Sequence, residues 1–76
     1  HELILPVLRY GSKGVAVKLW QTLLTMRNFH CGEIDGDFGA LTQAAVNKFQ
    51  QWAKIAVDGV VGKDTWTELL KIERIG

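Results

Sequence analysis

The residues best suited to chemistry in this chain are three aspartates, Asp35, Asp37 and Asp58, and the adjacent pair His30 and Cys31. Paired carboxylates can act as the acid and base of glycoside hydrolysis, and clustered carboxylates can bind Ca²⁺. A histidine beside a cysteine can contribute to a zinc site. The sequence has no second pair of zinc ligands, no calcium-loop pattern and no short motif of a nucleotide-binding or hydrolytic site. We therefore expect no catalytic residue, no metal and no cofactor.

Two of these aspartates open a motif that the chain uses twice. Its form is D-G-x-Φ-G-x-x-T, where Φ is apolar, and its copies span residues 35–42 and 58–65. Asp-Gly favours a tight turn, because the carboxylate accepts backbone N–H bonds and glycine adopts positive φ at little cost. We expect Phe38 and Val61 to point into the core, and Thr42 and Thr65 to bond back to the loop from the first turn of a helix. A turn followed by a helix is thus the repeated unit.

The spacing of apolar residues predicts three helices, over about 14–27, 40–53 and 63–72. Ser12 is expected to cap the first helix, and Asn28 to adopt left-handed geometry after it. This helix carries one stripe formed by Val17, Trp20 and Leu24, and a second formed by Leu19, Leu23 and Met26. Two stripes indicate either a helix buried on most sides or an exposed apolar patch.

The second helix is predicted to bury one face and expose the other. The predicted buried residues are Leu41, Ala45, Val46, Phe49 and either Trp52 or Ala53, and the predicted outward residues are Gln43, Asn47, Lys48, Gln50 and Gln51. Phe49 and Trp66 are expected in the core because of their helical spacing, whereas Trp52 lies at the edge of the predicted stripe.

Length and composition fit one small domain. The 76 residues are 47% hydrophobic with a net charge of +1, so we expect a compact monomer rather than a disordered tail. The near-neutral charge argues against nucleic acid as a partner, and no apolar run is long enough to span a membrane. Residues 1–10, with Pro6 among them, are predicted to form an extended lead-in that packs across the helices. The fold class is therefore all-α: a small closed three-helix bundle with ordered, glycine-containing loops.

The ordered set of motifs closely resembles the peptidoglycan-binding domain family of bacterial cell-wall hydrolases. The matching elements are G-S-x-G-x-x-V-x-x-W-Q from Gly11, D-G-x-F-G-x-x-T-x-x-A-V-x-x-F-Q from Asp35, and D-G-x-V-G-x-x-T-W-x-x-L from Asp58. The resemblance covers about residues 5–70. Trp20 stands where the family usually has leucine, and Asn28 and Lys54 where glycine is common. Lysine in the left-handed region costs about 1 kcal/mol, which leaves room for a different end to the second helix.

The resemblance implies a non-catalytic module that binds the glycan strand and stem peptide of peptidoglycan and tethers an amidase, muramidase or peptidase to the wall. It implies a secreted, extracellular protein, of which residues 1–76 are expected to be one domain cut from a longer chain. A shallow site for such a polymer needs an aromatic face with amide, hydroxyl or charged groups. The candidate binding residues are Asp35, Asp37, Phe38, Thr42, Gln43, Trp52, Tyr10 and Phe29. Gln21 and Gln50 are expected to bond loop backbone rather than ligand.

Two other functions are consistent with three helices. A protein-interaction module or pro-segment would dock on a neighbouring catalytic domain, and an exposed stripe of Leu19, Leu23 and Met26 would suit that role. A helix-turn-helix DNA-binding domain also has three helices. The third helix of this chain, however, carries few basic residues and two acidic ones, Asp64 and Glu68, so it is poorly suited to phosphate contacts. The wall-binding module is the principal prediction, and the docking module is its alternative.

Overall fold

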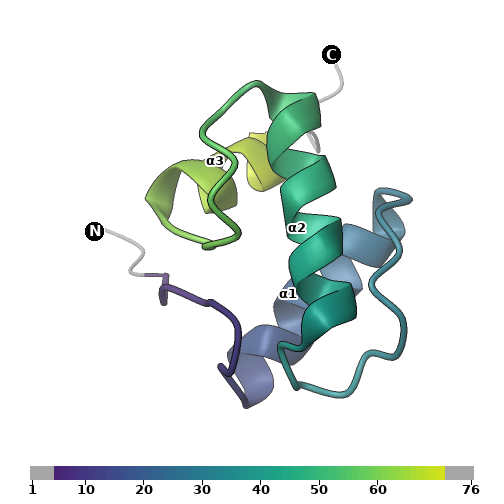
Figure 1. Ribbon diagram of the computed structural model, residues 1–76. Helices are drawn as coiled ribbons and strands as arrows, with labels where there is room; N and C mark the ends of the chain where they lie inside the picture. Colours follow the sequence, from purple (N-terminus) through teal and green to yellow (C-terminus); the bar gives the residue numbers. More distant parts are fainter. Residues whose placement is uncertain (1–4, 72–76) are drawn as a thin grey trace.

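The computed structural model describes residues 5–71 and contains three helices in that range, α1 (Val15–Met26), α2 (Ala40–Ala53) and α3 (Lys63–Lys71) (Figure 1). In place of strands, the described part has two isolated antiparallel bridges, which join Leu8 to Val61 and Lys13 to Asp37. The predicted all-α class and the three helix positions are confirmed. The predicted last residue of the third helix, Ile72, lies outside the described residues.

Three aromatic rings, one from each helix, fill the centre of the bundle. The Trp20 ring of α1 is fully buried and contacts Phe49 of α2 and Trp66 of α3 edge-on, with ring centroids 6.1 and 5.0 Å apart. Edge-to-face contacts at these distances stabilise beyond the area that they bury. The predicted core positions of Phe49 and Trp66 are therefore confirmed, and Trp20 is the ring that joins them.

The N-terminal lead-in pairs with both repeated turns. Leu8 exchanges two backbone hydrogen bonds with Val61, at 3.0 and 2.7 Å, and the Trp66 indole N–H donates to the Pro6 carbonyl at 2.7 Å. Further along, Gly11 N–H donates to the Phe38 carbonyl at 2.9 Å. The extended lead-in is confirmed for the described part of the segment, while residues 1–4 lie outside it. Figure 1 shows the described part of the lead-in running from beside α3 to the start of α1.

The buried face of α2 is rotated from the predicted one. Leu41 was predicted to be buried and is 67% exposed, and Gln50 was predicted to face outward and is 1% exposed. Both of these predictions are wrong. The buried stripe consists of Thr42, Ala45, Val46, Phe49 and Gln50. Thr42 and Gln50, the polar residues at the two ends of this stripe, can be buried because each forms side-chain hydrogen bonds within the core.

The helix ends differ from the predictions in two places. Ser12 does not cap α1: the N-cap residue is Gly14, without a side-chain cap, and the Ser12 hydroxyl accepts the Arg9 N–H at 3.0 Å instead. Asn28 adopts the expected left-handed geometry with φ 69°. Lys54 does so too, with φ 62° and ψ 38°, so α2 ends in the usual left-handed way despite the cost for lysine.

The second apolar stripe of α1 is largely open to solvent. Leu19 is 49% and Met26 is 64% exposed, whereas Leu23 is half-buried and packs against the core. None of the helices within residues 5–71 is long and apolar enough to cross a bilayer.

Candidate functional site

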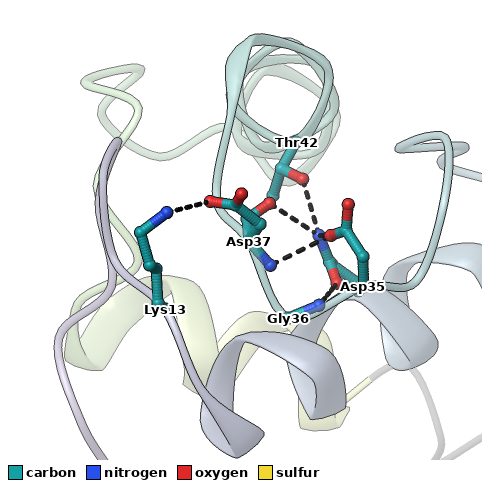
Figure 2. A network of polar contacts seen from close by, with 6 residues as sticks. Lys13, Asp35, Gly36, Asp37 and Thr42 are labelled. Carbon is teal, nitrogen blue, oxygen red and sulfur yellow. Dashed lines mark hydrogen bonds and ion pairs between the residues drawn. The ribbon is translucent and has the colours of Figure 1, made fainter.

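The first Asp-Gly turn, residues 35–42, is held by one buried glutamine of α1. The Gln21 Nε2 donates to Asp35 Oδ1, to the Asp37 carbonyl and to Thr42 Oγ1, at 3.2, 3.1 and 3.0 Å (Figure 2). Its Oε1 accepts the Gly36 N–H at 2.9 Å. A single amide thereby binds four points of the loop, which fixes the loop at the start of α2. The prediction that Gln21 bonds loop backbone is confirmed.

The second Asp-Gly turn, residues 58–65, is held in the same way by Gln50 of α2. Its Nε2 donates to Asp58 Oδ1, to the Val60 carbonyl and to Thr65 Oγ1, at 3.0, 3.0 and 3.1 Å. Its Oε1 accepts the N–H groups of Asp58 and Gly59, both at 3.1 Å. The repeated unit is therefore a turn together with the glutamine of the preceding helix, and the two motif threonines complete it.

Hydrogen bonds stabilise the ionised form of the first aspartate in each turn. The Asp37 N–H, and next the Gln21 amide, hold the pKa of Asp35 below its ordinary value of 3.8. The Val60 N–H, and next the Gln50 amide, lower the pKa of Asp58 in the same way. Both carboxylates are thus ionised acceptors within their turns at neutral pH, which is the structural role expected of an Asp-Gly pair.

A cleft of about 380 Å³ opens beside the first turn. Its lining combines carboxylates, a hydroxyl and apolar groups from the middle of α1, the loop between α1 and α2, and the first turn of α2. The lining residues are Gln21, Cys31, Glu33, Asp35, Asp37, Gly39, Ala40, Leu41 and Thr42. Three of them, Asp35, Asp37 and Thr42, are candidates from the sequence. Glu33 and Leu41 were missed, because Leu41 resembled a core residue and Glu33 lies in a loop with no local pattern.

Acceptors and donors lie side by side in this cleft. Asp37 pairs with Lys13 of the lead-in, Nζ to Oδ1 at 3.2 Å, and both side chains are well exposed (Figure 2). No side chain caps the N-terminus of α2, because its N-cap residue is Gly39. The first N–H groups of a helix have no partner within the helix, so they are suited to donate to a ligand oxygen. The cleft can therefore bind groups that both donate and accept hydrogen bonds.

The remaining sequence candidates lie outside the cleft. Phe38 is 1% exposed and belongs to the core, as its motif position predicts, so its ring has no face open to a ligand. Tyr10 is 61% exposed on the lead-in. Gln43 packs beside the second turn, its Nε2 3.2 Å from where a Cβ at Gly59 would stand.

Two candidates, Phe29 and Trp52, come together near the C-terminal end of α2. Their ring centroids are 6.0 Å apart, and Trp52 also stacks on buried Phe49 at 6.0 Å with an interplanar angle of 29°. The structure thus brings five of the eight sequence candidates together in two places, the cleft and an aromatic cluster, at opposite ends of α2. Among residues 5–71 there is no group of three or more histidine, cysteine or acidic side chains placed to hold a metal.

Comparison with known proteins agrees with this geometry. Residues 13–69 match the family model described as "Putative peptidoglycan binding domain". A spore cortex-lytic enzyme of Bacillus cereus is 35% identical over 65 residues, which are 86% of this chain and 25% of that protein. An uncharacterized protein of Kitasatospora aureofaciens is 42% identical over 65 residues, 84% of this chain and 55% of that one. The chain thus spans between a quarter and about half of these relatives.

The fold has a close counterpart among solved structures. The crystal structure of the SleB N-terminal domain superposes with a TM-score of 0.86 at 32% identity, covering 93% of this chain and 97% of that one. The family match includes both turns and both glutamines that hold them. The chain therefore belongs to the peptidoglycan-binding domain family.

Proposed function

We propose that this domain binds bacterial cell-wall peptidoglycan without catalysing a reaction, and that it holds an attached hydrolase on the polymer. The observation that carries the proposal is the family match over residues 13–69. The similarity to part of a spore cortex-lytic enzyme supports a lytic neighbour, whether amidase, muramidase or peptidase, and a place in the cell wall outside the cell. Tethering acts by raising the local concentration of the catalytic domain at its substrate. The domain is proposed to act as a monomer within a secreted protein.

The cleft beside the first turn is the proposed binding site. Stem peptides and acetamido groups present amide N–H and carbonyl groups together, and the peptides add carboxylates and amines. The carboxylates of Glu33 and Asp37 would accept from ligand donors, and the uncapped N-terminus of α2 would donate to ligand oxygens. Leu41, exposed at the rim, offers apolar contact. Shallow sites of this kind bind modestly and depend on a few polar contacts.

The docking alternative is not favoured, because the relatives place domains of this family with enzymes that act on the wall. The feature that would suit such a docking surface is the pair of exposed side chains Leu19 and Met26 on α1.

Retention on insoluble peptidoglycan sacculi tests the proposal. Purified domain should co-sediment with sacculi at low and at high salt. With insoluble cellulose or chitin it should remain in the supernatant. An Asp37→Asn variant should be retained less, because one carboxylate acceptor of the cleft is lost. The matched control is Asp64→Asn beside the second turn, which should bind like the wild type. Folded wild-type protein that stays in solution with sacculi would overturn the proposal.

A further inference from the structure

A continuous exposed stripe runs along the outer face of α2. It consists of Leu41, Ala44, Lys48 and Trp52, all of them exposed. Residues spaced by three or four positions lie on one face of a helix, so these four side chains follow each other along the axis. The stripe begins in the cleft, because Leu41 lines it, and ends about 17 Å away at Trp52, given the rise of about 1.5 Å per residue.

Trp52 is both exposed and held in place. Its side chain is 59% exposed although tryptophan is a residue that folding usually buries. One face of the indole stacks on Phe49, which is fully buried, and the edge of Phe29 contacts it from the side. Phe29 in turn meets Phe49 edge-on, with ring centroids 5.3 Å apart. The cluster fixes the indole and leaves its outer face to solvent, so a ligand would find a ready-made flat surface at low entropic cost.

The surroundings of Trp52 favour a sugar ring over a protein partner. Protein interfaces of the docking type need a contiguous apolar patch of several hundred Å². Trp52 is instead flanked by the exposed polar side chains of Lys48, Gln51 and Lys54. An indole face bordered by amine and amide donors matches a pyranose, whose C–H face is apolar and whose edge carries hydroxyl and acetamido groups.

We propose that Trp52 is a sugar-stacking subsite for the glycan strand, which follows the outer face of α2 from the cleft. The inference rests on the proposed function and assigns the two ends of the helix to different parts of the polymer. The cleft takes the peptide-bearing portion, and Trp52 takes a pyranose ring further along the strand. The single methyl of Ala44 keeps the helix surface low between them, and Lys48 donates to the strand beside the indole.

The chain contains its own reporter for this subsite. Of its three tryptophans, Trp20 is fully buried and Trp66 is 2% exposed, so iodide in solution quenches mainly Trp52. Titration with peptide-free glycan oligosaccharides prepared from peptidoglycan should protect the emission from iodide. Trp52→Leu, which keeps an apolar side chain without a flat ring, should weaken glycan binding by about two- to tenfold. Trp52→Phe should recover part of the loss, and Leu19→Ala on α1 serves as the matched exposed control.

The outcomes separate this inference from the function on which it rests. Full binding of Trp52→Leu to sacculi and to glycan, with iodide quenching unchanged by glycan, would overturn the subsite and leave wall binding intact. Protection by isolated stem peptide but not by glycan would overturn the sugar assignment. Absence of sacculus binding by the wild type would overturn the proposed function itself. Chemical denaturation of each variant checks that it is folded.

Discussion

The two Asp-Gly turns share one internal framework and differ in what surrounds it. In each, a buried glutamine amide donates to an aspartate, a carbonyl and a threonine, and accepts backbone N–H groups. The position after the Asp-Gly pair is Asp37 in the first turn and Val60 in the second. The hollow beside the first turn measures about 380 Å³, and the one beside the second about 190 Å³.

This comparison separates residues that build the turn from residues that can bind. The glutamine, the first aspartate, the glycine and the threonine occur in both copies, and their polar groups are used within the protein. The position after the Asp-Gly pair differs: Asp37 is exposed and pairs with Lys13, whereas the matching residue of the second turn is the half-buried Val60. We therefore predict that binding at the first turn depends on side chains that the repeat itself does not require. The following predictions test that division, from the largest expected effect to the smallest.

Replacing the framework glutamines by glutamate should destabilise the domain most. Gln21→Glu and Gln50→Glu keep the shape of the side chain but set a carboxylate oxygen against three acceptors. Each should lower the unfolding free energy at pH 7 by about 3 kcal/mol, because buried polar groups lose their donor. Urea denaturation measures the change. If one variant lost less than about 1 kcal/mol, the two turns would not share a framework in energetic terms.

Alanine at the turn glycines should distinguish the two copies. Gly36 and Gly59 both have positive φ, 76° and 71°, so either substitution incurs about 1–2 kcal/mol of backbone strain. An added Cβ at Gly36 would stand 3.0 Å from the backbone oxygen of Gly14, whereas at Gly59 it meets the side chains of Gln43 and Asn47 at 3.2 and 3.3 Å. Because side chains can move and backbone cannot, Gly36→Ala should destabilise more. Thermal and urea unfolding of the pair check the order, and equal losses would contradict it.

Exchanging the differing residues should alter binding more than stability. Asp37→Val copies the second turn into the first and removes the exposed ion pair with Lys13, which should change the unfolding free energy by less than about 1 kcal/mol. Retention on sacculi should nevertheless fall. Val60→Asp is the reciprocal control and should leave retention unchanged. A large loss of stability in Asp37→Val would show that this residue belongs to the framework.

Acid should weaken both turns alike. Because the pKa of Asp35 and of Asp58 is lower in the folded chain than the ordinary 3.8, their stabilisation is complete above that pH. It is lost as the pH falls from 3.8 through the folded pKa values, where the unfolded state binds more protons. Unfolding free energy measured between pH 6 and pH 2 should show this decline. In the double variant Asp35→Asn and Asp58→Asn, the unfolding free energy should fall less steeply over this pH range. An unchanged decline would assign the acid sensitivity to other carboxylates.

The fold was predictable from the sequence because its signals are local. The Asp-Gly turns, the positions of the three helices and the left-handed Asn28 each depend on a few neighbouring residues, and all were confirmed. The errors on α2 have one cause. Its buried stripe begins and ends with Thr42 and Gln50, two polar residues that are satisfied by partners elsewhere in the chain, so hydrophobic spacing shifted the face toward Leu41.

The candidate site was only partly predictable. Asp35, Asp37 and Thr42 were found because they belong to the motif, but the cleft also needs the loop that carries Cys31 and Glu33 to fold back over the start of α2. That placement is fixed by contacts with residues distant in the sequence, such as the hydrogen bond that the Gly36 N–H donates to Gln21 Oε1, rather than by any pattern within the loop. Loop residues that line a cleft show no helical or strand periodicity, so the sequence around them does not mark them as part of a site.

The bond from the Trp66 indole to the Pro6 carbonyl bears on the order of folding. It joins residues 60 positions apart, whereas the Gln21 network joins residues 14 to 21 apart. Closing a loop that is three to four times longer costs about 1 kcal/mol more in chain entropy. The helices and their turns can therefore assemble first, and the lead-in docks onto a formed surface as the final step. Under a mechanical load applied at the N-terminal side, the same segment should detach first, and the two turns should remain folded behind it.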